Sequence, residues 1–137
     1  MIRTAAFAIA LLTAAPALAS DPASVALTFD TGAATGAIMV ALYDEATYGG
    51  GQPVRAARID VAAGEHSVTF EGLPAGDYGV KAFHDVNGNG RMDTNPFGMP
   101  TEPYAFSNNA RGNMGPASWE RARFTVSGAA AQTISIR

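Results

Sequence analysis

Ile-Met-Val-Ala-Leu-Tyr, residues 38–43, is the stretch of the sequence that most clearly decides the fold. It is apolar throughout and is bounded by the small residues of 32–36 on one side and by Asp44 on the other. A short apolar run between turn signals is typical of a strand in the middle of a sheet, whereas a helix would need about ten residues or more. We therefore expect a central β-strand over 38–43.

Other stretches on both sides show the alternation of apolar and polar residues that indicates a half-buried strand. They are 25–29, 57–61, 66–70, 78–84, 122–126 and 134–136. Turn residues separate most of them, and no long helical period is present. The sequence therefore predicts an all-β fold, a single antiparallel β-sandwich of about seven strands.

The segment 85–118, after the fifth predicted strand, shows neither period. Structureless segments of this length are uncommon in compact domains and are usually functional or disordered. This one contains Phe97, Tyr104 and Phe106, and disordered chains are poor in such residues. We therefore expect one long ordered loop, with Ser118 capping a short helical turn at its end.

Oxygen-bearing side chains recur at every second residue where this loop begins. Calcium takes six to eight oxygen ligands, and calcium loops supply them from positions 1, 3, 5, 7 and 9, with glycine at position 6. The residues at these positions are Asp85, Asn87, Asn89, Arg91 through its carbonyl, and Asp93, with Gly90 at the turn. Position 12 is Pro96 instead of a glutamate, and no helix precedes the loop. We expect a weak calcium site, with a dissociation constant of about 10⁻⁵ to 10⁻³ M.

Two points about this site stay open in the sequence. Glu102 could return to the loop and complete the ligand shell. Alternatively, the Asn-Gly dipeptides at 87–88 and 89–90 favour tight turns, so the stretch could be a metal-free hairpin. We favour calcium, because a bare turn gives no reason for carboxylates at both Asp85 and Asp93.

The second half of the loop carries residues that could contact a ligand. The candidates are Tyr104, Phe106, Ser107, Asn108, Asn109 and Trp119. The aromatic ones, together with Phe97, could stack on a sugar ring or grip a peptide. We favour the simpler interpretation, that they hold the loop against the sandwich. The polar ones could bind a ligand or the loop's own backbone.

No catalytic motif is visible. The chain has no cysteine, no Gly-x-Ser-x-Gly elbow and no His-Glu-x-x-His helix. Its two histidines, His66 and His84, lie on different predicted strands, and we expect them to be structural. A non-enzymatic binding or structural module is therefore expected. The alternative is a hydrolase that uses Asp85, Asp93 and Glu102 on a carbohydrate or an ester.

The first residues have the layout of a secretory signal peptide. Arg3 precedes an apolar run over 5–15, and Ala-Leu-Ala at 17–19 is a small-x-small cleavage site. The run is too short to span a bilayer, which needs about 20 residues. We expect removal of 1–19 and one exported domain over 20–137, periplasmic or extracellular, with no membrane span.

Composition narrows the class of partner. The chain has 9 basic and 12 acidic residues, a net charge of −3, and a single lysine, Lys81, which argues against nucleic acid. Without cysteine no disulfide can stabilise the exported domain, and a bound metal could do part of that. The expected partner is a protein or a glycan.

Four ordered blocks of sequence stand out together. They are Gly-Leu-Pro-Ala-Gly-Asp-Tyr at 72–78, His-Asp-Val-Asn-Gly-Asn-Gly-Arg-Met-Asp at 84–93, the segment 97–109, and the segment 115–124. This combination resembles the bacterial family catalogued as domain of unknown function 2141. The resemblance covers nearly all of the mature chain and implies an exported protein without an established activity.

A looser resemblance concerns the unit of two strands around Gly-Leu-Pro-x-Gly-x-Tyr, followed by an Asp-x-Asn-x-Asn-Gly loop. It is similar to prealbumin-like and immunoglobulin-like sandwich modules of bacterial surface proteins. In some of those modules such loops bind calcium, which implies the same role for Asp85, Asn87, Asn89 and Asp93.

Overall fold

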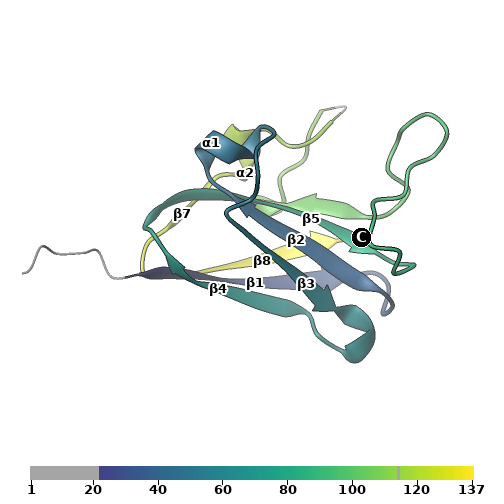
Figure 1. Ribbon diagram of the computed structural model, residues 1–137, viewed down its shortest axis with the longest axis horizontal. Helices are drawn as coiled ribbons and strands as arrows, with labels where there is room; N and C mark the ends of the chain where they lie inside the picture. The colour runs from purple at the N-terminus through teal and green to yellow at the C-terminus, as the bar shows by residue number, and fades with distance from the viewer. Residues whose placement is uncertain (1–21, 114) are drawn as a thin grey trace, which may run out of the picture.

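Two β-sheets make up the protein in the computed structural model, which describes residues 22–113 and 115–137 (Figure 1). The predicted signal peptide, 1–19, lies outside the described residues. The strands are β1 (Ala23–Thr31), β2 (Ala37–Tyr43), β3 (Arg55–Asp60), β4 (Ser67–Leu73), β5 (Gly76–Asp85), β6 (Tyr104–Phe106), β7 (Phe124–Val126) and β8 (Ala129–Ile136). The helical turns are α1 (Glu45–Tyr48), η1 (Val61–Ala63), η2 (Ser107–Asn109) and α2 (Trp119–Ala122). None of the helices in this part of the chain has the length and apolar character that a membrane span requires.

The smaller sheet has the strand order β4-β1-β8, and the larger sheet has the order β3-β2-β5-β6, with β7 also paired to β5. The predicted all-β class is confirmed. Residues 38–43 lie in β2, which has β3 on one side and β5 on the other. The central strand predicted from the apolar run is therefore present.

The antiparallel pairing predicted for the whole fold is wrong for β1 and β8. These strands run parallel, from Ser24 opposite Ala129 to Thr31 opposite Ile136. The reason is that β7 pairs with β5 in the other sheet, so the chain crosses between sheets before β8 and forms no hairpin there. A hydrogen bond of 2.8 Å from the Ser24 N–H to the Gly128 carbonyl holds this crossing against β1.

The inward faces of the two sheets share one hydrophobic core. Ile38, Val40 and Leu42 of β2 are buried in it, and they meet Phe29 of β1 and Ile134 of β8 in the same cluster. Successive side chains of a strand point to opposite faces of the sheet. The residues between the buried positions of β2 therefore face outward, away from the core.

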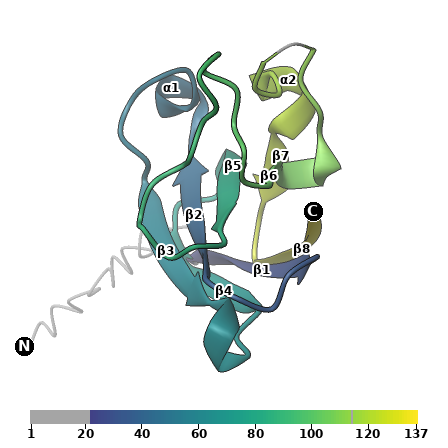
Figure 2. The same cartoon turned by 90° about the vertical axis from the view of Figure 1, so that its right-hand side faces the viewer.

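This outer face of the larger sheet carries most of the irregular structure. The helices α1 and α2 and the loop 86–103 all rise from it, while the smaller sheet covers the opposite face (Figure 1). The view along the strands shows α1 and α2 on either side of β5, with the loop in front (Figure 2). The outer face is thus framed by the segments that the sequence assigned to turns and to the long loop.

The predicted loop 85–118 is not free of regular structure. Its residues 104–106 form β6, which pairs with β5, and η2 follows directly. Sequence periodicity missed β6 because three residues are too few to show a period. The helical turn expected after Ser118 is present as α2, but the Ser118 side chain makes no capping hydrogen bond.

Candidate ligand groove and cation loop

The loop 85–93 is organised around the buried carboxylate of Asp85, whose side chain is 2% exposed. Its Oδ2 accepts a hydrogen bond of 2.6 Å from the Gly90 N–H, and its Oδ1 accepts one of 3.2 Å from the Asn89 N–H. Gly88 and Gly90 have φ angles of +72° and +79°, which glycine adopts without strain. The chain therefore turns tightly around this one carboxylate.

The second carboxylate of the loop, Asp93, accepts hydrogen bonds from the side chains of Asn87 and Asn89. The side-chain amide of Asn89 donates to its Oδ1 at 2.7 Å, and the amide of Asn87 donates to its Oδ2. These hydrogen bonds, that of Asn89 first, hold the pKa of Asp93 below its ordinary value. Asn89 thus donates to both carboxylates, to Asp85 through its backbone N–H and to Asp93 through its side-chain amide.

The lowered pKa of Asp93 has a consequence in acid. Because the folded pKa lies below the ordinary value of 3.8, the ionised carboxylate stabilises the loop above that value, and the stabilisation is lost as pH falls through the folded pKa. In an NMR titration we expect the side-chain amide signals of Asn87 and Asn89 to move together below about pH 4. The amide of Asn95, which makes no bond to Asp93, is the control. Signals of Asn87 and Asn89 that stay constant down to pH 2 would refute this arrangement.

Glu102 returns to the loop, but it binds the backbone. Its side chain is 7% exposed, its Oε2 accepts a 2.6 Å hydrogen bond from the Val86 N–H, and its Oε1 accepts one of 3.0 Å from the Asp93 N–H. The sequence suggested this residue as a metal ligand. In the structure its carboxylate instead fastens the two ends of the loop to each other.

The donors of the loop suit a weakly bound hard cation. Among residues 22–113 and 115–137, no group of three or more His, Asp or Glu side chains is arranged to hold a metal ion. A calcium ion would depend on the carboxylates of Asp85 and Asp93 and on neutral oxygens from Asn87, Asn89 and the Arg91 carbonyl. Each asparagine amide carries an oxygen beside its NH₂, so a turned amide would offer that oxygen to an ion. Calcium binding at this loop therefore stays a prediction, with only two carboxylates as charged donors.

A groove of about 1080 Å³ lies on the outer face of the larger sheet, beside this loop. Its floor is made of side chains from neighbouring strands in register. Met39 of β2 pairs with Phe83 of β5, which pairs with Tyr104 of β6. In the adjacent row Ala41 pairs with Lys81, which pairs with Phe106. Its lining also includes Met92, Met99 and Pro100 of the loop 86–103.

Lys81 is the polar group at the centre of the floor. Its Nζ donates a 2.6 Å hydrogen bond to the Tyr48 carbonyl and lies 4.3 Å and 4.9 Å from the ring centroids of Tyr48 and Tyr43. Burial lowers the pKa of Lys81 and raises that of Tyr48 to about 12. The ammonium group is therefore partly withdrawn from water among aromatic rings.

The model of the family described as uncharacterized protein conserved in bacteria (DUF2141) matches residues 30–135. The chain belongs to this family. The matched span contains both the loop 85–93 and every residue of the groove floor. No curated protein and no solved structure matches the chain. The family resemblance expected from the four sequence blocks is thereby confirmed. The geometry of the site remains the basis for inferring a function.

The aromatic candidates of this DUF2141 protein are divided between two places. Tyr104, 48% exposed, and Phe106 line the groove, with ring centroids 6.0 Å apart. Trp119 instead packs on Tyr48 at 5.5 Å and joins α2 to α1 in a small second core. Phe97 is 88% exposed and does not line the groove.

The polar candidates hold the protein's own backbone. The Ser107 hydroxyl is fully buried, donates to the Ala122 carbonyl and accepts from the Val80 N–H at 2.9 Å. The side-chain amide of Asn108 donates to the carbonyl groups of Arg121 and Arg123 at the end of α2. Asn108 also exchanges hydrogen bonds with Gln132 of β8. Asn109 accepts from the Ser135 N–H of β8. These three residues therefore fasten η2 to α2, β5 and β8.

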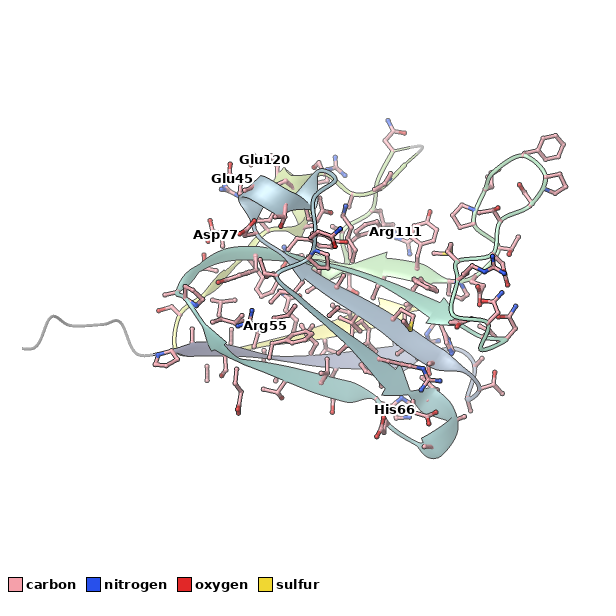
Figure 3. All side chains as sticks on the ribbon, in the orientation of Figure 1. Glu45, Arg55, His66, Asp77, Arg111 and Glu120 are labelled. Carbon is pink, nitrogen blue, oxygen red and sulfur yellow. The ribbon has the colours of Figure 1, made fainter. Side chains whose placement is uncertain are left out.

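The two histidines were predicted on different strands; His84 lies in β5, whereas His66 lies just before β4 and not in a strand. His84 is fully buried, and its Nε2 lies 2.6 Å from the Thr35 carbonyl oxygen. His66 is exposed at the turn before β4 (Figure 3). Neither belongs to a metal-binding group among the described residues.

Sequence reasoning missed most of the groove floor, including Met39, Ala41, Lys81 and Phe83. One signal was present, because residues 38–43 are apolar on both faces of the strand while only one face reaches the core. The register that brings Lys81 and Phe83 beside them depends on pairing across the sheet, which a single sequence does not contain.

Proposed function

We propose that this DUF2141 protein is an exported, non-enzymatic binding module that holds an elongated apolar ligand on the outer face of its larger sheet. The observation that carries the proposal is the groove floor, where Met39, Phe83 and Tyr104 lie in one row outside the main core. Phe106, a buried member of the small second core, lies in the adjacent row. Contiguous apolar surface of this kind marks interaction sites in soluble proteins. The volume, about 1080 Å³, lies just above the usual range of about 300–1,000 Å³ for small-molecule sites.

The apolar floor favours such a ligand over a glycan. Sugar sites need several polar groups directed at hydroxyls, and the polar candidates Ser107, Asn108 and Asn109 make hydrogen bonds within the protein. A hydrolase acting through carboxylates has less support, because Asp85 and Glu102 are buried and accept backbone N–H groups. The lowered pKa of Asp93 also makes it a poor general acid.

We infer that the two sheets form a sandwich of the prealbumin-like or immunoglobulin-like kind. Support comes from the single core between the sheets and from the crossing of the chain from β7 to β8. Export is proposed from the signal-like sequence of 1–19.

Calcium is proposed as the stabiliser of the side of the groove that the loop 86–103 forms. Met92 belongs to the loop 85–93, and Met99 and Pro100 follow it before Glu102 closes the loop. An ion held by Asp85 and Asp93 would neutralise two carboxylates and hold this wall in place. The metal would thus act on the shape of the groove and not on a bound substrate.

Thermal unfolding tests the ion. With a dissociation constant of about 10⁻⁴ M, 1 mM calcium is expected to add about 1.4 kcal/mol and to raise Tm by about 5 °C. Chelator should reverse the shift, and Asp93→Asn should abolish it while Asp77→Asn, at an exposed carboxylate elsewhere, should not. An unchanged Tm at 10 mM calcium would contradict the proposal.

Titration with 1-decanol tests the groove, with displacement of a neutral fluorescent probe as the signal. Ala41→Trp places a large side chain on the floor and is expected to weaken binding at least about tenfold, because the ligand loses most of its apolar contact. Ala131→Trp, on the exposed face of β8, is the matched control and should bind normally. Equal binding by both variants would place the ligand elsewhere, and no binding by the wild type would refute the proposed function.

A further inference from the structure

The groove carries charge of only one sign. Arg58 and Lys81 are its charged lining residues, and no described Asp or Glu lines it, although the chain as a whole has a net charge of −3. Glu45 and Glu120 lie on the helices α1 and α2 (Figure 3) and are not part of the lining. A positive site within an acidic protein is selective, because it attracts anions that the rest of the surface repels.

Lys81 has unused hydrogen-bonding capacity. An ammonium group has three N–H donors, and one of them is given to the Tyr48 carbonyl. Within the part of the chain that the structure describes, no carboxylate lies within salt-bridge distance of its Nζ. The two tyrosine rings offset part of the cost of withdrawing this charge from water, but they are no substitute for an anion.

The position of Lys81 also gives a direction to the ligand. Along β5 the chain runs from Lys81 to Phe83 on the same face, about 7 Å further on, and then enters the loop that supplies Met92 and Met99. Beyond the ammonium group the floor over Phe83 and the wall of the loop are apolar. The second cation of the lining, Arg58, is exposed on the edge strand β3, where it pairs with Met39. A ligand with an anion at Lys81 would therefore lay an apolar chain over Phe83 toward the loop.

We propose that the groove takes an anionic amphiphile, a single alkyl chain that ends in a carboxylate or a phosphate. The anion pairs with Lys81, and the chain lies over Met39 and Phe83 against Met99. This inference rests on the proposed function, since it names the class of ligand for the same groove.

The test compares three ligands of equal chain length, decanoate, 1-decanol and decyltrimethylammonium, each below its micelle-forming concentration. Wild-type protein is expected to bind decanoate about tenfold tighter than 1-decanol, as a charge-assisted hydrogen bond in a partly dry site allows. Lys81→Met keeps an apolar stem and should remove this preference, so that decanoate and 1-decanol bind with about the same affinity. Lys81→Arg should keep the preference, and so should Arg121→Gln, which removes an exposed cation outside the groove.

A second measurement needs no variant. Lys81 is the only lysine of the chain, so an amine-reactive reagent followed by peptide mapping reports on this site separately from the N-terminus. Decanoate should protect Lys81 at concentrations about tenfold lower than 1-decanol does. Equal binding of the acid and the alcohol, or tighter binding of the cation, would refute the preference for an anion. The groove would still stand as the binding site for an apolar ligand. Failure of all three ligands to bind would instead overturn the proposed function.

Discussion

Replacing Gly36 by alanine should lower the free energy of unfolding by about 3 to 5 kcal/mol. Gly36 precedes β2 with a φ of +69°, and an added Cβ would lie 2.0 Å from the Asp85 carbonyl oxygen. A backbone oxygen cannot yield as the end of a side chain can. The substitution therefore forces the turn before β2 away from Asp85, the first residue of the loop 85–93.

The matched control is Gly72→Ala. Gly72 has nearly the same φ, +68°, but no atom within 4 Å of the added Cβ, so it isolates the conformational cost of about 1 to 2 kcal/mol. Urea unfolding of the two variants measures the difference. If both lose the same stability, the close approach of Gly36 to Asp85 has no energetic weight, and the position assigned to the loop is wrong.

Removing the Glu102 carboxylate should also destabilise the protein strongly. Glu102→Ala leaves the partly buried N–H groups of Val86 and Asp93 without their acceptor, and a donor left unpaired costs about 1 to 3 kcal/mol where water cannot replace the acceptor. We expect a loss of about 2 to 4 kcal/mol in urea unfolding. Amide hydrogen exchange should also accelerate at Val86 and Asp93, because those two N–H groups lose their partner.

Glu65→Ala is the control for this change. Glu65 also accepts a backbone N–H, that of Asp60 at 2.9 Å, but its side chain is exposed and water can replace it. Its loss should cost at most about 1 kcal/mol. Equal costs for the two glutamates would mean that Glu102 is as accessible to water as Glu65 and does not fasten the loop.

The fold could be predicted from the sequence as far as local pattern reaches. The apolar run over 38–43 and the alternation at Val25, Leu27 and Phe29 indicated strands because burial on one face imposes a period of two. The parallel pairing of β1 and β8 could not be predicted in the same way. It depends on where β7 pairs, and a three-residue strand carries almost no pattern.

The site shows the same division. Oxygen-bearing residues at 85, 87, 89 and 93 pointed to the loop because their spacing is local. The role of Glu102 was not visible, since a carboxylate that accepts two backbone N–H groups has the same sequence signature as a metal ligand. The groove was missed for a different reason. Its floor combines three strands whose register exists only in the folded sheet.

The loop that begins at Asp85 also forms one wall of the groove. Residues that organise the loop, such as Asp85 and Glu102, are buried and do not line the groove, whereas Met92 and Met99, which lie between them in the sequence, do. A change in the loop should therefore alter ligand affinity without touching the floor. Calcium dependence of ligand binding, lost in Asp93→Asn, is the expected sign of this coupling.

Methyl NMR of the protein labelled at methionine, recorded during a titration with 1-decanol, tests whether the groove is the ligand site. Met39, Met92 and Met99 all line the groove, one on the floor and two on the loop. We expect their three methyl signals to shift together and to saturate at one dissociation constant, and we expect no such shifts in Ala41→Trp. Saturable binding that leaves these methyl groups unchanged would contradict the assignment of the groove as the ligand site.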